Sequence, residues 1–266
     1  MDGAAPVPRI SLVERSLHRE ILEWQPRHLE LAKVAREAFG LDAVEYGSEF
    51  FRDKATDFAY LAEMRKRAQD QGVASVLVKV SDAGPLGSAE APERYTAIEA
   101  HFPWVVAAAF LGCESVSVAA EGFGSGAPYL EWTADSLQRL GTLAGAYGIQ
   151  VLVGNRTGLA CDGSWMAALM KRTAHPKVGT HPHFDNFDLG GGKTYPRYQG
   201  VQEMLPWAKA LAARGEEPRV DFARMAKLAI DAGYSGWVGI EFDGTDVPER
   251  EGVARTIALV RRAWAG

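Results

Sequence analysis

The chain is short of the features that mark several protein classes. It has two cysteines in 266 residues, Cys113 and Cys161, and their spacing matches neither a metal motif nor a disulfide framework. So few cysteines suit a reducing cytoplasm, which is the expected location. The N-terminus lacks the apolar core of a signal peptide, and no stretch approaches the roughly 18 apolar residues of a membrane span.

An excess of positive charge is also missing. The formal net charge is −5, and no basic run is interleaved with aromatic residues, so a nucleic-acid partner is not expected. The hydrophobic content of 47% and the charged content of 24% are typical of a globular protein. We expect a small-molecule substrate and no membrane partner, and leave a homo-oligomer open.

The chain has no G-x-G-x-x-G after its first β-branched run, which disfavours a dinucleotide-binding open sheet. The run Gly190-Gly191-Gly192 fits neither common phosphate-binding motif and is interpreted as a flexible loop. A doubly wound open sheet therefore remains only as the alternative to a closed barrel.

What the chain does contain is a regular alternation of short β-branched runs and longer amphipathic segments. The expected strands are Ile10–Val13, Ala43–Tyr46, Ser75–Val80, Ser115–Ala119, Gln150–Val153, Lys177–Thr180, Ala208–Ala212 and Trp237–Glu241. The expected helices are His28–Phe39, Ala55–Gln71, Ala91–Leu111, Thr133–Tyr147, Ser164–Arg172, Tyr198–Leu205, Phe222–Ala232 and Val253–Ala265. Eight such units predict an α/β fold, a (β/α)8 TIM barrel, as a single domain over residues 1–266 with residues 1–9 as a flexible tail.

One segment concentrates chemistry. After the sixth expected strand the chain reads His181-Pro182-His183-Phe184-Asp185, with imidazoles and a carboxylate at alternate positions. In an extended chain, side chains two residues apart point the same way. Imidazole suits both proton transfer near neutral pH and metal binding. The segment therefore indicates an acid-base site or a metal site.

Function in such barrels lies at the C-terminal ends of the strands, so the remaining site residues follow from the expected strands. They are His18 after strand 1, Glu45 on strand 2, Lys79 on strand 3, Arg156 after strand 5, Arg214 after strand 7 and Glu241 on strand 8. Lys79 follows an unbroken apolar run, so alternation leaves open whether it points into the barrel or out toward a helix.

These residues, in this order, resemble the sugar phosphate isomerase/epimerase group of the xylose-isomerase-like TIM barrels. The similarity runs from about Ile10 to Trp264. It is carried by Ser16-Leu17-His18-Arg19, Leu41-Asp42-Ala43-Val44-Glu45-Tyr46, Leu111-Gly112-Cys113, Val178-Gly179-Thr180, Asn186-Phe187, Ala232-Gly233-Tyr234-Ser235-Gly236 and Gly239-Ile240-Glu241.

The resemblance implies a divalent metal held near the ends of late strands, and two glutamates, from strands 5 and 8, that move a proton next to a carbonyl. This chain departs from that pattern. Gly154 stands where the strand 5 glutamate is usual, His183 replaces a ligand aspartate and Asp185 replaces a glycine. Glu241 keeps the late-strand position, and Glu45 and His18 are also kept.

Other polar positions are lost as well. Strand 3 usually ends in an acidic pair, where this chain has Ser81 and Ala83, and strand 4 carries Ser117 and Ala119 in place of arginine and asparagine. A less polar barrel mouth indicates a substrate other than a sugar, such as a secondary metabolite.

Three hypotheses follow. The first is an enzyme doing metal-independent acid-base chemistry (isomerisation, epimerisation, elimination or cyclisation) on a small oxygenated metabolite. Its catalytic residues are His183, Glu241, Asp185 and Glu45, and its substrate-binding residues are His18, Lys79, Arg156, His181 and Arg214. In it, Asp185 orients His183.

The second hypothesis is a metal-dependent sugar or keto-acid isomerase. A rebuilt site of His181, His183, Asp185 and Glu241 would hold zinc, manganese or iron. The third is a non-catalytic barrel that serves as a subunit or binding protein.

Overall fold

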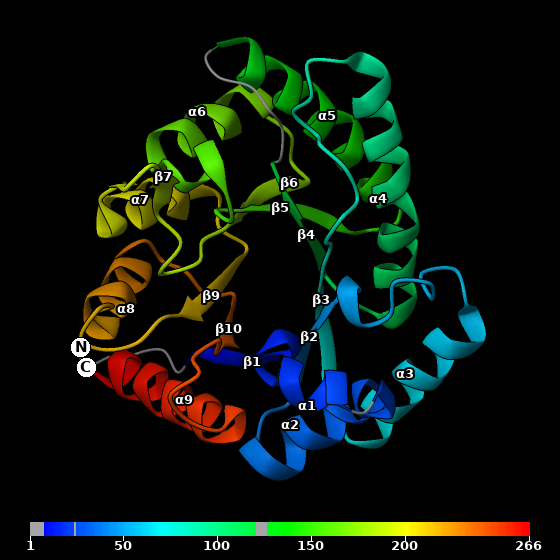
Figure 1. The fold of residues 1–266 in the computed structure, drawn as a ribbon, viewed down its shortest axis with the longest axis vertical. Coiled ribbons are helices and arrows are strands. Elements are labelled where there is room, and N and C mark those ends of the chain that lie inside the picture. Colours follow the sequence, from blue (N-terminus) through cyan, green and yellow to red (C-terminus); the bar gives the residue numbers. More distant parts are fainter. Residues whose placement is uncertain (1–7, 24, 121–126) are drawn as a thin grey trace.

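The computed structural model describes residues 8–23, 25–120 and 127–266. Its main feature is one eight-stranded parallel sheet curled into a barrel, seen end-on in Figure 1. The strands are β1 (Arg9–Val13), β2 (Ala43–Gly47), β3 (Ala74–Lys79), β4 (Ser115–Ala119), β5 (Gln150–Gly154), β6 (Val178–His181), β9 (Ala210–Arg214) and β10 (Trp237–Glu241).

The barrel is closed between β6 and β9 by isolated bridges rather than by a continuous ladder. Thr180 bridges to Ala208, and His183 bridges to Ala212. Backbone hydrogen bonds reinforce the second bridge, since Ala212 donates to the Pro182 carbonyl at 2.9 Å and Phe184 donates to the Ala212 carbonyl at 3.0 Å. The loop that carries His183 is therefore tied into the barrel wall.

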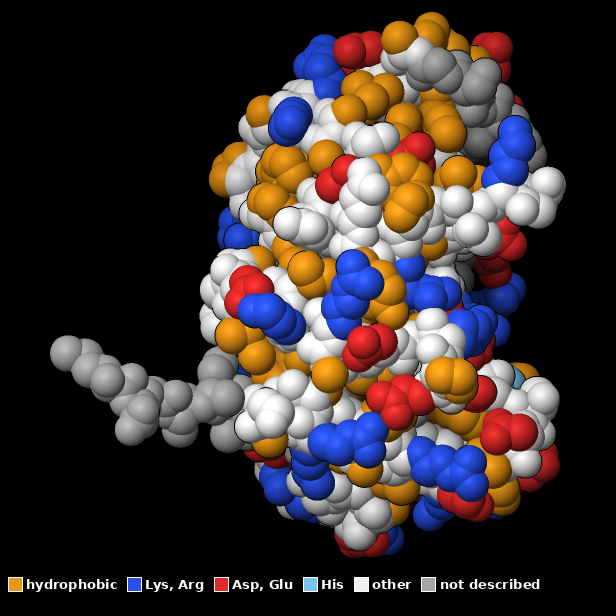
Figure 2. Space-filling view, turned by 90° about the vertical axis from the view of Figure 1, so that its left-hand side faces the viewer, with side chains coloured by type: hydrophobic (Ala, Val, Ile, Leu, Met, Phe, Trp, Pro, Cys, Tyr) orange, Lys and Arg blue, Asp and Glu red, His pale blue; other side chains and the backbone are white. Residues whose placement is uncertain are grey.

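Helices form a ring around the sheet (Figure 1). They are α1 (His18–Glu23), α2 (Leu31–Phe39), α3 (Phe58–Asp70), α4 (Ala91–Leu111), α5 (Ala127–Ala146), α6 (Gly163–Thr173), α7 (Arg197–Met204), α8 (Phe222–Asp231) and α9 (Glu249–Ala265). In Figure 2 the layer over α7, α8 and α9 shows acidic and basic side chains mixed with scattered hydrophobic ones, as expected for helices that face solvent. In the described residues no helix has the length and apolar character to cross a membrane.

Most of the expected elements are confirmed. Seven strands lie within one residue of their expected bounds, whereas β9 begins two residues later than expected because a 3-10 turn, Leu205–Trp207, precedes it. The sequence did not predict α1 or the exposed hairpin β7 (Asp188–Gly190) and β8 (Lys193–Thr194), whose turn holds the glycine run. Of the expected flexible tail, residues 1–7 lie outside the described residues, and Arg9 already belongs to β1.

Two packing features place the site. A small cluster that includes Ala43, Leu77, Leu152 and Ala210, from four strands, is separate from the large cluster between sheet and helices. Lys79 lies two residues beyond Leu77 on β3 and therefore shares its face.

Both cysteines are buried and neither forms a disulfide, as their number and spacing in the sequence predicted.

Candidate active site

Glu241 is the centre of a charged group at the C-terminal mouth of the barrel. It ends β10, and its Oε1 lies 3.1 Å from Nζ of Lys79, which ends β3. Its other oxygen, Oε2, lies 3.2 Å from Nδ1 of His183, in the loop after β6. The fold thus joins a carboxylate, an ammonium and an imidazole from three separate units. The interpretation in which Lys79 points inward is confirmed.

Burial and charge set the protonation of these three groups. Their side chains are 3%, 12% and 0% exposed for Glu241, Lys79 and His183. Burial lowers the pKa of His183 to about 4, although Glu241 opposes this shift, so the imidazole is neutral at neutral pH. Burial disfavours the charged form of Glu241, but Lys79 and His183 outweigh it and hold its pKa well below the usual range. The result is an ionised carboxylate against a neutral imidazole.

His181 stands beside this group in a second network. Its ring lies 4.7 Å from that of His183, centroid to centroid. Its Nδ1 lies 3.0 Å from the hydroxyl of Ser117, and Arg156 donates to the same hydroxyl at 2.9 Å. Arg156 also donates to the carbonyl oxygens of Ser117 and Val80, both at 3.0 Å, so it spans the ends of β3, β4 and β5.

Gly154 and Asn155 explain how the two histidines fit. A Cβ at Gly154 would make a tight contact with Nε of Arg156 at 3.3 Å and an ordinary contact with Nε2 of His183 at 3.4 Å, so Gly154 lies between these two side chains. Asn155 accepts from the His183 amide at 2.7 Å and donates to the carbonyl oxygens of His183 and Asn186 at 3.1 and 2.6 Å. It therefore fixes the loop that carries the imidazole.

Glu45 lies close to the same charges. It sits on β2, and Ser11 donates to its Oε1 at 2.6 Å. Burial raises the pKa of Glu45 to about 7, and Glu241 adds to the rise while Ser11 and Lys79 oppose it. Glu45 is therefore partly protonated at neutral pH. It can hold a proton near Glu241 without adding a full negative charge.

Three other predicted residues pair elsewhere. Asp185 accepts from Arg197 at 3.1 Å and lies 2.6 Å from Arg219. The expectation that Asp185 orients His183 is corrected, because the carboxylate beside that ring belongs to Glu241. The reason is that Arg197 at the start of α7 and Arg219 in the segment before α8 reach Asp185, and sequence spacing does not reveal these contacts.

Arg214 and His18 also have partners of their own. Arg214 donates to Asn186 and to Asp243, although its charge still lowers the pKa of Glu241 as a minor contribution. Nδ1 of His18 lies 3.1 Å from Glu249, at the start of α9. The structure therefore does not bring His18 into contact with the charged group around Glu241.

The residues do not fit the divalent metal that such barrels imply. Within the described ranges, no three His, Cys, Asp or Glu side chains are arranged to hold a metal ion. The Lys79 ammonium lies beside the Glu241 oxygen that a cation would need, and Asp185 is engaged by two arginines. The metal set of His181, His183, Asp185 and Glu241 does not assemble in this arrangement.

Sequence reasoning did not recognise Ser11, Ser117 and Asn155 as parts of the site. Ser117 lies in the middle of an expected strand and Asn155 lies two residues after another, which was the available signal. Their roles depend on partners between 28 and 64 residues away, namely His183 for Asn155 and His181 for Ser117.

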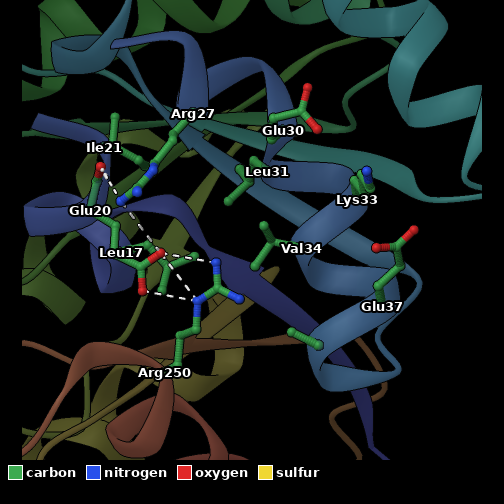
Figure 3. A pocket seen from close by; sticks show the side chains of 11 residues that line it. Leu17, Glu20, Ile21, Arg27, Glu30, Leu31, Lys33, Val34, Glu37 and Arg250 are labelled. Atoms are coloured by element: carbon green, nitrogen blue, oxygen red, sulfur yellow. Dashed lines mark hydrogen bonds and ion pairs between the residues drawn. The ribbon is translucent and has the colours of Figure 1, made fainter. Parts of the chain in front are cut away.

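A cavity on the outside of the barrel is unrelated to these residues. It has a volume of about 290 Å³ and lies between α1, α2 and the start of α9 (Figure 3). Leu17, Ile21 and Val34 line it, and Glu20 and Arg250 pair across one side. None of the residues predicted for the site borders it.

Comparison with known proteins agrees with this architecture. The family described as xylose isomerase-like TIM barrel matches residues 32–263. The chain belongs to that family. No curated protein sequence matches the chain significantly.

Solved structures of this barrel family are similar over almost the whole chain. The 3-keto-D-glucoside 4-epimerase of E. coli is 14% identical with a TM-score of 0.75, covering 96% of this chain and 99% of the other. A sugar phosphate isomerase/epimerase from Parabacteroides distasonis is 17% identical with a TM-score of 0.73, covering 98% and 96%. A xylose isomerase-like TIM barrel protein from Mycobacterium smegmatis, in complex with magnesium, is 15% identical with a TM-score of 0.70, covering 99% and 100%. At these identities the similarity establishes the fold.

Proposed function

We propose that this protein is an isomerase- or epimerase-type enzyme that moves a proton next to a carbonyl of a small oxygenated substrate without a metal. The observation that carries the proposal is the group formed by Glu241, Lys79 and His183, in which an ammonium takes the place beside the late-strand carboxylate. The epimerases and isomerases among the similar barrels support the reaction class.

His183 is the base in this proposal. Glu241 faces its Nδ1, which favours the tautomer with the proton on Nδ1 and leaves the lone pair on Nε2. Nε2 takes a proton from the carbon next to the substrate carbonyl. The C–H electron pair forms the C=C bond of an enolate, and the carbonyl π pair moves to oxygen. Glu241 stabilises the imidazolium until the proton returns to the same or a neighbouring atom.

Lys79 supports this chemistry through charge. It helps to keep Glu241 ionised in a buried site, and its side chain is the most exposed of the three, at 12%. A cation there can stabilise negative charge that develops on the substrate oxygen. Glu45, with its pKa of about 7, is a proton reservoir nearby.

The substrate proposed is a small ketone, hydroxyketone or sugar-like metabolite. Gly154, Ala119 and Ser117 at the mouth offer fewer polar groups than a sugar site usually needs, which favours a secondary metabolite. The two buried free thiols agree with a reducing, cytoplasmic location.

The test is solvent exchange. Chelator-treated protein is incubated in D2O with hydroxyacetone, dihydroxyacetone and D-fructose as probes, and loss of the proton next to the carbonyl is followed by 1H NMR. We expect exchange that falls at least about 10²-fold in His183→Gln and Glu241→Gln. Lys79→Met should also slow exchange, because it removes the cation that stabilises the developing negative charge. Its matched control is Lys227→Met, since Lys227 is an exposed lysine paired with Asp231 on α8. Absence of exchange with every probe would contradict the proposed reaction class for these substrates.

A metal-dependent isomerase is the alternative outcome, and the magnesium complex of the M. smegmatis barrel favours it. Metal analysis of protein purified without added metal separates the two. About one equivalent of metal, together with exchange that is lost to chelator and restored by Mg²⁺ or Mn²⁺, would refute the metal-free proposal.

A further inference from the structure

The two histidines at the barrel mouth have ring nitrogens without a hydrogen bond. Within the described residues, Nε2 of His181 and both ring nitrogens of His183 are buried and have no hydrogen-bond partner. A buried ring nitrogen without a partner is costly, so its persistence points to a ligand that completes it. Gly154 borders Nε2 of His183, since a Cβ there would lie in ordinary contact with it at 3.4 Å.

The hydroxyl of Ser117 determines which nitrogen of His181 carries the proton. Arg156 can only donate, so the Ser117 oxygen accepts from it at 2.9 Å. The described part of the chain gives this hydroxyl one other contact, Nδ1 of His181 at 3.0 Å. If Nδ1 carried the proton, the buried hydroxyl hydrogen would be left without an acceptor. When Ser117 donates to Nδ1 instead, the hydroxyl hydrogen and Nδ1 are both paired, and the only unpaired group of the two side chains is the Nε2–H of His181, which places the proton of His181 on Nε2.

His183 has the opposite arrangement. Its Nδ1 lies 3.2 Å from Oε2 of Glu241 without forming a well-aligned hydrogen bond, and the ionised carboxylate attracts an N–H and repels a lone pair at that distance. The proton of His183 therefore belongs on Nδ1, which leaves Nε2 as an acceptor. Of the two neighbouring rings, His181 thus presents an N–H at Nε2 and His183 presents a lone pair at Nε2.

We propose that His181 is a second catalytic residue, a neutral imidazole whose Nε2–H donates to the substrate oxygen while Nε2 of His183 takes the proton from the adjacent carbon. Arg156 and Ser117 are positioning residues that fix the His181 tautomer. The inference rests on the proposed function for its catalytic meaning. The ligand class it names is a carbonyl compound with an acidic C–H next to the carbonyl, held as its enolate during reaction. No proton leaves His181 in this step, so the proton balance is that of His183 alone.

The tautomer can be tested without any substrate. The 15N-labelled protein is studied at pH 7.5 by long-range 1H–15N correlation NMR, with the rings assigned by His181→Gln, His183→Gln and His101→Gln variants. His101 is the internal reference, because its Nδ1 lies 2.7 Å from the Ala97 carbonyl, which can only accept, and burial lowers its pKa to about 4.

We expect His101 and His183 to carry the proton on Nδ1 and His181 to carry it on Nε2. In Ser117→Ala, the Nε2–H form of His181 should lose its dominance while His101 stays unchanged. A His181 ring protonated on Nδ1 in the unaltered protein, or one unaffected by Ser117→Ala, would overturn the inference. The tautomer measurement does not depend on the exchange assay. The tautomer assignment can therefore fail while the proposed reaction holds, and the proposed reaction can fail while the tautomer assignment holds.

The catalytic part is tested on a probe that exchanges in D2O. Removing a donor to a developing oxyanion typically lowers kcat by about 10²–10³-fold, which we expect for His181→Leu. His181→Gln keeps an N–H at a similar distance from the backbone and should recover most of the loss, with KM changed less than kcat. Equal kcat in the two variants, when both are folded by circular dichroism, would contradict a donor role.

Discussion

Replacing Lys79 with methionine removes the ammonium but keeps a chain of similar length beside Glu241. At 3.1 Å, opposite unit charges attract by about 5 kcal/mol in a medium of effective dielectric constant about 20. Burial of Lys79 offsets part of this attraction, since it lowers the pKa of that amine. Breaking a buried pair by removing one partner typically costs about 3–5 kcal/mol, and we expect Lys79→Met to lose that much unfolding free energy.

The double variant separates the pair from the packing. Glu241→Gln alone should also be destabilised, because Lys79 is left buried without its carboxylate. The double variant Lys79→Met/Glu241→Gln should recover at least about 2 kcal/mol relative to the sum of the single losses, since neither charge is then stranded. Urea unfolding of chelator-treated protein at pH 7, followed by circular dichroism, gives the four free energies.

The matched control is Lys227→Met, which breaks an exposed pair with Asp231 and should change stability little. The reasoning is refuted if both single variants at the barrel mouth lose less than about 1 kcal/mol and the double variant is additive. The Lys79–Glu241 contact would then contribute nothing to the native state in solution.

Three further predictions concern neighbouring residues. The pKa of Glu45 is raised to about 7, so between pH 4.5 and 7 the native state holds a proton that the unfolded chain has lost, and stability falls as pH rises. Glu45→Gln should therefore be more stable than the unaltered protein by up to about 3 kcal/mol at pH 8, with the gain vanishing below pH 4.5 in urea titrations. Lys79→Glu adds a carboxylate beside Glu241 and His183 and should create a Mn²⁺ site, visible by calorimetry and absent from the unaltered protein. Asn155→Ala removes three hydrogen bonds from the His183 loop and should lower unfolding free energy by about 2–4 kcal/mol in the same urea assay.

The sequence predicts the barrel well because its signals are local. Short β-branched runs and glycine helix ends each depend on a few adjacent residues, and seven strands follow them within one residue. The exception, β9, lies in an alanine-rich stretch where polar and apolar positions do not alternate. There the register is set by hydrogen bonds to the β6 loop, such as that from Ala212 to the Pro182 carbonyl.

The site is predicted less completely because its pairs are remote in sequence. Strand alternation alone left Lys79 undecided, since the residues before it are uniformly apolar; its partner Glu241 is 162 residues away. Asp185 was assigned to His183 because they are neighbours in sequence, whereas its ion pairs are with Arg197 and Arg219. The sequence was enough to choose which types of residue belong to the site, but only the fold shows which of these residues pair with one another.

The departures from the usual family pattern leave a carboxylate and an ammonium whose charges balance. Two carboxylates expected after strands 5 and 6 are absent, at Gly154 and His183, which leaves Glu241 as the late-strand carboxylate. One carboxylate does not neutralise the charge of a divalent ion, whereas it does neutralise an ammonium. The ammonium of Lys79 lies 3.1 Å from Glu241. Gly154 also borders Nε2 of His183. In the proposed function these changes together give a site that moves protons with imidazoles, which is why the tautomers of His181 and His183 are the property to measure first.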